Sequence, residues 1–275
     1  MSGAVPSRPR RPKSVLSIAG SDSSGGAGIQ ADIKTIEALG LYAQTAVTAL
    51  TAQNTMGVAA VAGTEPSMVA AQIDAVFADI VPDAVKVGMI PSGDVARAVV
   101  DRLHAHGACN IVVDPVMVAT SGAVLADEGA VSKELFGMAA VVTPNIPEAE
   151  VLLGRVARQE YRIASEADAE HAAKALARHF GCAFLVKGGH GAHDANDVLA
   201  TPEGDVCWLR AGRIDNPNTH GTGCTLSSAI ACGLAQGFDV PSAVEDAKKY
   251  LEGCLLAHLD LGRGSGPLDH MWRFF

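Results

Sequence analysis

The sequence predicts an α/β protein with a mainly parallel central sheet and helices on both of its faces. Strand-like and helix-like segments alternate from residue 14 to residue 262, without an internal repeat or a linker. Of the 275 residues, 48% are hydrophobic and only 4% aromatic, which is typical of helices packed closely on a sheet. This length accommodates one large α/β domain or two small ones.

Each expected element follows from a local pattern. The predicted strands are short apolar runs at residues 15–19, 44–50, 58–62, 84–87, 111–113, 141–142, 184–186, 198–200 and 206–209. The predicted helices carry apolar residues at helical spacing and cover 29–39, 67–80, 94–106, 148–153, 165–180 and two segments that begin at Cys224 and Pro241. Because ligands of such sheets bind beyond the carboxyl ends of the strands, polar residues that follow the strands are candidate site residues.

Composition and charge narrow the possible partners. Residues 1–13 are rich in proline and arginine and are expected to form a disordered basic tail, so that residues 14–275 form a single domain. The formal net charge of −9 argues against a nucleic-acid partner. No apolar run reaches the roughly 18 residues of a membrane span, so no membrane partner is expected.

The cysteines indicate a reducing compartment. Six cysteines are present without a C-x-x-C pair, so neither a zinc site nor a disulfide framework is expected. They are predicted to be free thiols, most of them buried, of a cytoplasmic protein. The N-terminal segment lacks the apolar core of a secretory signal.

A glycine-rich loop before a helix is the strongest functional signal. Residues 218–224 read Asn-Thr-His-Gly-Thr-Gly-Cys and lead directly into the apolar-periodic run 226–234. The unpaired N–H groups and positive dipole of a helix start bind phosphate, and Gly221 and Gly223 let the backbone approach it. Cys224 at this helix start is interpreted as a reactive thiol with a lowered pKa, or as a small apolar helix residue.

A second glycine-rich segment, 20–32, follows the first strand. Residues 26–31 fit the loose dinucleotide pattern G-x-G-x-x-[GA], which keeps a nicotinamide-dependent oxidoreductase as an alternative. The pattern starts about six residues after the strand, however, and the acidic residue expected about 20 positions later is missing. Asp32 is either an acid of the first helical turn or a hydrogen-bond acceptor for a ligand at the loop rim.

Two residues after other strands could meet the organic part of a substrate. The Gln53 amide both donates and accepts hydrogen bonds, which suits the edge of an aminopyrimidine, whereas Asn54 suits a turn. Met89 is either a core residue or a ligand contact.

Four further residues suit phosphate and metal. Asp114 closes an apolar strand and is a candidate for magnesium. Glu148 falls in the first turn of a helix that Pro147 starts, where it complements the helix dipole or supplies a second magnesium carboxylate, with Asn145 alongside. Lys187 precedes two glycines at a strand end, from where it can reach phosphate. His190, three residues later, is interpreted as a surface residue. Neither a P-loop nor a G-x-S-x-G elbow occurs.

Five of these segments, taken in order, closely resemble the bacterial hydroxymethylpyrimidine kinase / phosphomethylpyrimidine kinase family of the ribokinase superfamily. The segments are 19–32, 51–55, 143–148, 187–190 and 218–224, and the resemblance runs from about residue 15 to 270. It implies a three-layer α/β/α sandwich and a homodimer. It also implies transfer of the ATP γ-phosphoryl group to 4-amino-5-hydroxymethyl-2-methylpyrimidine and then to its monophosphate, in thiamin biosynthesis.

The resemblance also implies roles for individual residues. The pyrimidine site would contain Gln53, Asp32, Gly20 and Met89. Catalysis would use the anion hole of Gly221, Thr222, Gly223 and Cys224, with Cys224 either the base or a group that orients the hydroxyl. Asn145 and Glu148 match the superfamily's magnesium motif, and Lys187 lies where nucleotide phosphates are contacted. Together with the strand-end candidates, we expect Lys187, Asn145 and Thr219 to contact the nucleotide and Glu148 and Asp114 to hold Mg²⁺.

Other functions remain as alternatives. A pyridoxal or pyridoxine kinase of the same superfamily would keep the chemistry and change the substrate. A non-catalytic binder of a vitamin precursor would not need an anion hole for a phosphoryl group. One residue departs from the family pattern, because Thr120 occupies a position where many members carry Lys.

Overall fold

The computed structural model describes residues 11–116, 133–188 and 194–275. Thr120 and His190 lie outside these described residues. Within them the strands are β1 (Ser14–Asp22), β2 (Tyr42–Asn54), β3 (Gly57–Gly63), β4 (Ala84–Val87), β5 (Ile111–Val113), β6 (Val141–Val142), β7 (Ala183–Val186), β8 (Asp197–Ala200) and β9 (Val206–Leu209). They form one sheet in the order β3-β2-β1-β4-β5-β6-β7-β8-β9.

The centre of the sheet is parallel and its edges are antiparallel hairpins. Neighbouring strands from β2 through β1, β4, β5 and β6 to β7 are parallel, whereas β3 pairs antiparallel with β2, and β8 and β9 close the other edge. The expected mainly parallel sheet is therefore confirmed. One expected boundary is wrong, because β2 continues to Asn54 and Gln53 lies within it. The antiparallel pairing of Gln53 with Val58 extends the strand beyond its buried part.

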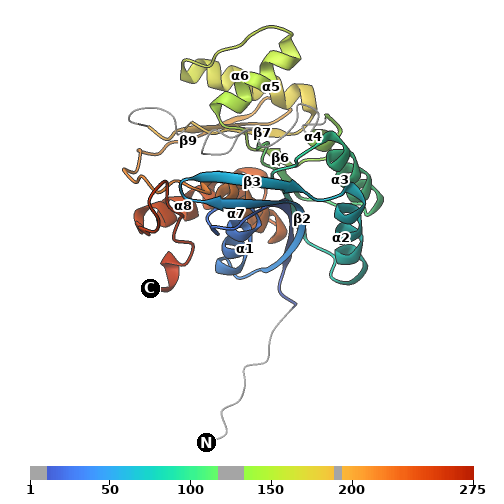
Figure 1. Cartoon of the computed structure of the whole chain (residues 1–275). Coiled ribbons are helices and arrows are strands. Elements are labelled where there is room, and N and C mark those ends of the chain that lie inside the picture. Colours follow the sequence, from blue (N-terminus) through green and yellow to red (C-terminus); the bar gives the residue numbers. More distant parts are fainter. Residues whose placement is uncertain (1–10, 117–132, 189–193) are drawn as a thin grey trace, which may run out of the picture.

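Helices cover both faces of the sheet, which confirms the three-layer arrangement (Figure 1). The helices are α1 (Gly28–Ala38), α2 (Pro66–Asp79), α3 (Gly93–Ala105), α4 (Lys133–Gly137), α5 (Ile146–Ala157), α6 (Glu166–Phe180), α7 (Thr222–Ala235) and α8 (Val240–Leu256), followed by the short 3₁₀ helix Trp272–Phe274. One hydrophobic core unites residues of α2 to α6 with the sheet, and a second unites α1, α7 and α8 with its opposite face. Alternation of side chains along each strand supplies both cores.

The carboxyl ends of the parallel strands lie along one edge of the sheet. Backbone hydrogen bonds hold the residues that directly follow two of these strands. The amide of Asp114 donates to the carbonyl of Val87 at 2.8 Å, and the amide of Thr143 donates to Val113 at 2.9 Å. These bonds extend the ladder one residue past each strand. The polar side chains that follow the strands are therefore held at fixed positions along this edge.

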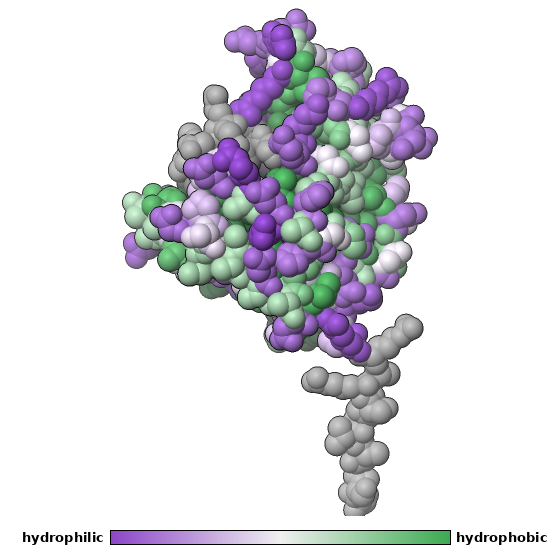
Figure 2. Space-filling model, turned by 90° about the vertical axis from the view of Figure 1, so that its right-hand side faces the viewer, coloured by the Kyte–Doolittle hydropathy of each residue, from purple (hydrophilic) through white to green (hydrophobic). Residues whose placement is uncertain are grey.

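The end of the basic N-terminal segment is not a free tail. Lys13 Nζ lies 2.6 Å from Asp83 Oδ1, and the Lys13 carbonyl accepts from the Tyr42 amide at 2.9 Å. Lys13 is therefore part of the folded domain, and the expected boundary at residue 13 is too late. Figure 2 shows hydrophilic side chains spread over the visible face of the molecule. Within the described residues no helix is both long and apolar enough to cross a membrane.

Candidate active site

The glycine-rich loop and the start of α7 form the centre of the site. Gly221 is the N-cap of α7 with φ of +88°, and a Cβ there would lie 1.9 Å from the Gly26 carbonyl oxygen. Only glycine fits this position. In the described part of the chain, the Gly223 and Cys224 amides donate to no acceptor, whereas the Thr222 amide lies 3.3 Å from the Thr219 carbonyl. Two backbone donors of the helix start are therefore available to an anion.

Lys187 and Asp114 lie directly beside this helix start. Lys187 Nζ is 2.9 Å from Asp114 Oδ1, and a Cβ on Gly223 would lie 3.1 Å from Asp114 Oδ2 and 3.5 Å from Lys187 Nζ. Burial acts to lower the pKa of Lys187, but the carboxylates of Asp114 and Glu148 outweigh it and raise this pKa. An ammonium that stays charged next to two free amides is suited to phosphate.

Glu148 and Asn145 are tied to each other at the start of α5. The Asn145 side chain accepts from the Glu148 amide at 2.9 Å, and Glu148 Oε2 accepts from the Asn145 amide at 2.8 Å, which is a capping box. The interpretation of Glu148 as an acid that stabilises its helix start therefore agrees with the structure. Its carboxylate is buried, and it acts on Lys187 together with Asp114.

Magnesium fits these two carboxylates. In residues 11–116, 133–188 and 194–275 no group of three or more Asp, Glu, His or Cys side chains is arranged to hold a metal ion. Mg²⁺ does not need one, because it keeps several waters and binds through one or two carboxylates and substrate phosphates. Asp114 Oδ2 accepts no hydrogen bond from the described residues and faces Gly223.

Asp32 does not lie at the loop rim, which corrects the expected location. Its side chain is fully buried and forms a bidentate ion pair with Lys86, whose Nζ lies 2.9 Å from each carboxylate oxygen. Ser17 Oγ at 2.5 Å and Ser228 Oγ at 2.8 Å also donate to it. A buried carboxylate needs such partners. Asp32 therefore links α1 to Lys86 of β4 and to Ser228 of α7 instead of facing the loop rim.

The environment of Cys224 contradicts the expected reactive thiolate. Burial raises the pKa of the thiol to about 11, with further upward contributions from the Asp32 and Asp114 carboxylates. Lys86 and the Gly28 amide act in the opposite direction without reversing the shift. The lowered pKa was predicted from the positive dipole of the helix N-terminus. Burial and the two negative charges outweigh this effect. The thiol is therefore protonated at neutral pH.

Gly20, Met89 and Gln53 come from three different strand ends. A Cβ on Gly20 would lie 2.8 Å from the Met89 sulfur, so the methionine packs directly on the backbone of β1. Gln53 has two neighbours. Ser23 Oγ bonds its backbone N–H at 2.8 Å and its backbone carbonyl at 2.7 Å. Thr51 Oγ1 lies 3.2 Å from its side-chain Oε1 and shares its single hydrogen with the Ser21 carbonyl at 2.8 Å. Asn54 accepts from the Met56 amide and serves the hairpin turn.

Three residues of this edge were not among the candidates from sequence. Asp22 and His220 are both buried, and His220 Nε2 lies 2.8 Å from Asp22 Oδ2. Lys86 is the partner of Asp32. Asp22 and His220 belong to the two glycine-rich motifs. They are 198 positions apart, and no pattern in the sequence indicates that their side chains are in contact. Thr219, by contrast, is exposed and contacts Ser265 through a 3.3 Å hydroxyl pair.

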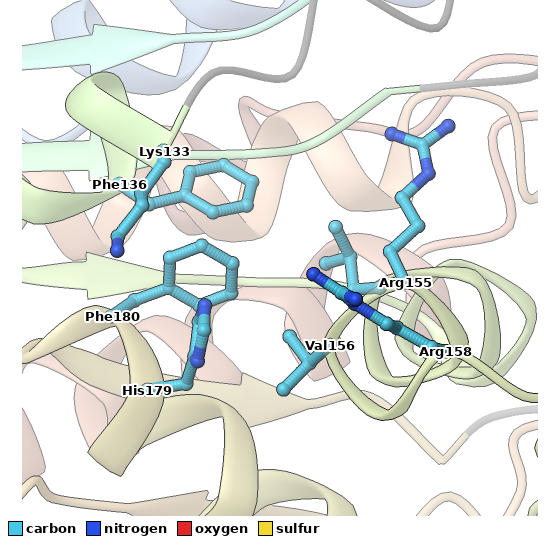
Figure 3. A pocket seen from close by; sticks show the side chains of 8 residues that line it. Lys133, Phe136, Arg155, Val156, Arg158, His179 and Phe180 are labelled. Carbon is cyan, nitrogen blue, oxygen red and sulfur yellow. The ribbon is translucent and has the colours of Figure 1, made fainter.

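A separate pocket of about 300 Å³ lies between α4, α5 and α6 (Figure 3). The rings of Phe136 and Phe180 meet edge to face at its apolar side, 5.0 Å apart. Its basic residues Arg155 and His179 belong to the last turns of α5 and α6, where positive charge complements the helix dipole. None of the predicted site residues lines this pocket.

Solved structures similar to this chain include kinases of small molecules. The crystal structure of a phosphomethylpyrimidine kinase from Clostridium difficile 630 matches with a TM-score of 0.74 and 39% identity, covering 87% of this chain and 98% of that one. The ADP complex of Bacillus subtilis pyridoxal kinase matches with a TM-score of 0.85 and 32% identity, covering 96% and 99%. The fold and site thus define a kinase of ribokinase-like architecture.

Sequence comparison gives the family. The family model of phosphomethylpyrimidine kinase matches residues 22–269. The hydroxymethylpyrimidine/phosphomethylpyrimidine kinase of Rhizobium meliloti (strain 1021) is 48% identical over 267 residues, which cover 94% of this chain and 97% of that protein. The chain belongs to the phosphomethylpyrimidine kinase family.

Proposed function

We propose that this enzyme transfers the γ-phosphoryl group of ATP to 4-amino-5-hydroxymethyl-2-methylpyrimidine and then phosphorylates the monophosphate to the diphosphate, in thiamin biosynthesis. One observation carries the proposal. The Gln53 amide, suited to an aminopyrimidine, lies 3.3 Å from His220, inside the loop that leads to the free amides of α7. A pyrimidine held by Gln53 is thereby next to the phosphate-binding helix start.

The transfer step uses groups that are already in place. The hydroxymethyl oxygen attacks the γ-phosphorus, the bond between that phosphorus and the ADP oxygen breaks, and the hydroxyl proton passes to a phosphate oxygen or to water. Charge on the phosphoryl oxygens is stabilised by the Gly223 and Cys224 amides and by Lys187. A protonated Cys224 thiol does not accept the proton, so Cys224 orients the hydroxyl instead.

Mg²⁺ would be held by Asp114 and Glu148, and it would supply positive charge to the nucleotide phosphates. Asn145 and Thr219 would contact the nucleotide from the two neighbouring loops. Asp32 would act through Lys86, since both of its oxygens are already occupied by Lys86 and two serines.

The decisive experiment is mass analysis of products after incubation with ATP, Mg²⁺ and hydroxymethylpyrimidine. We expect the monophosphate first and the diphosphate later, with ADP formed only when the pyrimidine is present. A parallel reaction with pyridoxal tests the second candidate function, which the similarity to Bacillus subtilis pyridoxal kinase favours. Turnover of pyridoxal without turnover of the pyrimidine would overturn the proposal, and ATP-independent pyrimidine binding alone would indicate a non-catalytic binder.

We further propose a homodimer in the cytoplasm. The β2–β3 hairpin leaves Leu50 58% and Val61 47% exposed, and β3 has no partner on its outer edge among the described residues. An exposed edge of this kind is normally covered, and an identical edge related by a two-fold axis covers it most simply. Six unpaired cysteines and the use of ATP support a reducing cytoplasm.

A further inference from the structure

The loop of residues 20–28 and the loop of residues 218–224 are fastened to each other by one buried pair. His220 Nε2 lies 2.8 Å from Asp22 Oδ2, and the two side chains are only 7% and 4% exposed. Asp22 ends β1 and His220 precedes the N-cap of α7. The pair therefore spans the segment that carries Gly20 and the segment that carries the phosphoryl-binding amides.

Asp22 is also the centre of its own loop. Its carboxylate accepts from the amides of Ser24 at 2.8 Å, Gly26 at 3.2 Å and Ala27 at 2.8 Å. Burial acts to raise the pKa of Asp22, but hydrogen bonds from His220 and Ser24 outweigh it and lower the pKa to about 2. Asp22 is thus an anion at neutral pH, and the hydrogen on His220 Nε2 is assigned toward it.

The hydrogen on His220 Nε2 also affects the neighbouring Gln53 side chain. The Gln53 Nε2 atom lies 3.3 Å from His220 Nε2. The Gln53 oxygen lies 3.2 Å from Thr51 Oγ1, whose single hydroxyl hydrogen it shares with the Ser21 carbonyl at 2.8 Å. A ring nitrogen that carries a hydrogen has no lone pair to accept from Gln53. With Asp22 in place, His220 cannot capture the amide, and the Gln53 hydrogens remain available to a ligand.

Close packing makes the arrangement sensitive to small displacements. A Cβ on Gly26 would lie 2.4 Å from His220 Cδ2, and a Cβ on Gly221 would lie 1.9 Å from the Gly26 oxygen. The two loops therefore meet through glycine backbone, and the imidazole fills the remaining space. A displacement of one loop is transmitted directly to the other.

We propose that Asp22 and His220 are positioning residues for phosphoryl transfer, which hold the two loops in register and keep the Gln53 amide free for the pyrimidine. The inference rests on the proposed function and deepens it. A displacement of about 1 Å between reacting groups is enough to cost on the order of 100-fold in rate. The pair should therefore affect kcat and the KM for the pyrimidine.

The test compares two amides at position 220. Gln reaches far enough to place an N–H donor near the location of Nε2, whereas Asn places its donor near the location of Nδ1 and cannot reach Asp22. We expect kcat of His220→Asn to fall on the order of 100-fold and its KM for hydroxymethylpyrimidine to rise, with the KM for ATP unchanged. His220→Gln should recover most of both losses.

His106→Asn is the matched control, because His106 Nε2 forms a 2.6 Å pair with Asp74 Oδ1 far from the site, between α2 and the end of α3. Its kinetics should equal those of the wild type. Gly26→Ala provides a second route, since it displaces His220 without removing a hydrogen-bonding group, and it should reproduce the kinetic losses of His220→Asn.

The outcomes separate the two proposals. A wild type without pyrimidine kinase activity would overturn the proposed function itself. Wild-type turnover together with an unchanged kcat and KM in folded His220→Asn would overturn the positioning role. Equal losses in His220→Asn and His220→Gln would also overturn it, because the hydrogen bond to Asp22 would then be irrelevant. If His220→Asn does not fold, wild-type kinetics of folded Gly26→Ala would decide against the proposal.

Discussion

The Lys86 ammonium lies close enough to Cys224 to act on the pKa of its thiol. Burial lowers the pKa of Lys86 in principle, but the adjacent Asp32 carboxylate reverses this and raises it. For Cys224 the opposing effects of Lys86 and the Gly28 amide are too small, and burial keeps the thiol protonated. At neutral pH Lys86 is thus charged and Cys224 is neutral, because only Lys86 has a dedicated counter-ion.

The first prediction at this scale concerns Cys224. Cys224→Ala should lower kcat on the order of 100-fold, because the attacking hydroxyl is then less well oriented. The affinity for nucleotide, measured by calorimetry, should stay the same. Because the pKa of the thiol is about 11, its alkylation by iodoacetamide should be slow at pH 7.5. The alkylation rate should then rise steadily as the pH is raised toward this pKa. A plateau in alkylation rate near pH 8 would contradict the protonated thiol, and full activity of Cys224→Ala would remove its positioning role.

The second prediction concerns the buried ion pair. Lys86→Met leaves the Asp32 carboxylate buried without its counter-ion, which should destabilise the protein by about 3–5 kcal/mol in urea unfolding. The double variant Lys86→Met/Asp32→Asn removes both charges and should be more stable than the single variant. Lys249→Met, which breaks only exposed pairs with Glu245 and Asp246, is the control and should unfold like the wild type. A double variant no more stable than Lys86→Met would argue against an uncompensated charge.

At the scale of elements, the C-terminal segment is hydrogen-bonded to the first turn of α7 and to the loop before it. Thr225 Oγ1 lies 2.9 Å from His270 Nε2, and Tyr250 of α8 donates to the His270 carbonyl at 2.8 Å. The Gly266 amide donates to Asn218 Oδ1 at 3.0 Å. Residues about 50 positions apart thereby hold the first turn of α7 and the loop before it, which is why the free amides of this turn have a fixed direction.

The third prediction follows from this element. Burial, followed by the charge of Lys34, lowers the pKa of His270 to about 4, against 6.5 for an exposed histidine. Between pH 6.5 and pH 4 the unfolded state therefore binds more protons, so stability falls as the pH falls through this window. The loss amounts to roughly 3 kcal/mol. In urea unfolding at several pH values, His270→Gln should lose this part of the pH dependence, and an unchanged dependence would contradict it.

At the scale of the whole molecule, the sheet has two different edges. The strands β8 and β9 form one edge, next to α6. There Asp197 of β8 accepts from the Gly188 amide at 2.8 Å and from Lys248 Nζ of α8 at 2.6 Å. The β2–β3 hairpin forms the other edge, and β3 is largely exposed. A two-stranded extension is marginal by itself in water, and it carries Gln53 near its tip.

The fourth prediction tests the proposed homodimer at this hairpin. Replacing the exposed side chains in Leu50→Asp or Val61→Asp should convert the dimer to a monomer in sedimentation velocity, because a buried unpaired charge at the contact is costly. Phe238→Asp, which charges an exposed apolar residue between α7 and α8, serves as the control and should leave the mass unchanged. A monomeric wild type at micromolar concentration would refute the homodimer.

The sequence by itself determined the order of the elements, the parallel sheet and the two glycine-rich loops, because these depend on local periodicity and on the backbone requirements of glycine. The placement of Gln53 within a strand, the burial of Asp32 and the protonated state of Cys224 were decided only by the tertiary structure. So were the meeting of Asp22 with His220 and of Lys86 with Asp32. Desolvation and ion pairing depend on neighbours distant in the chain, and no local pattern of residues specifies them.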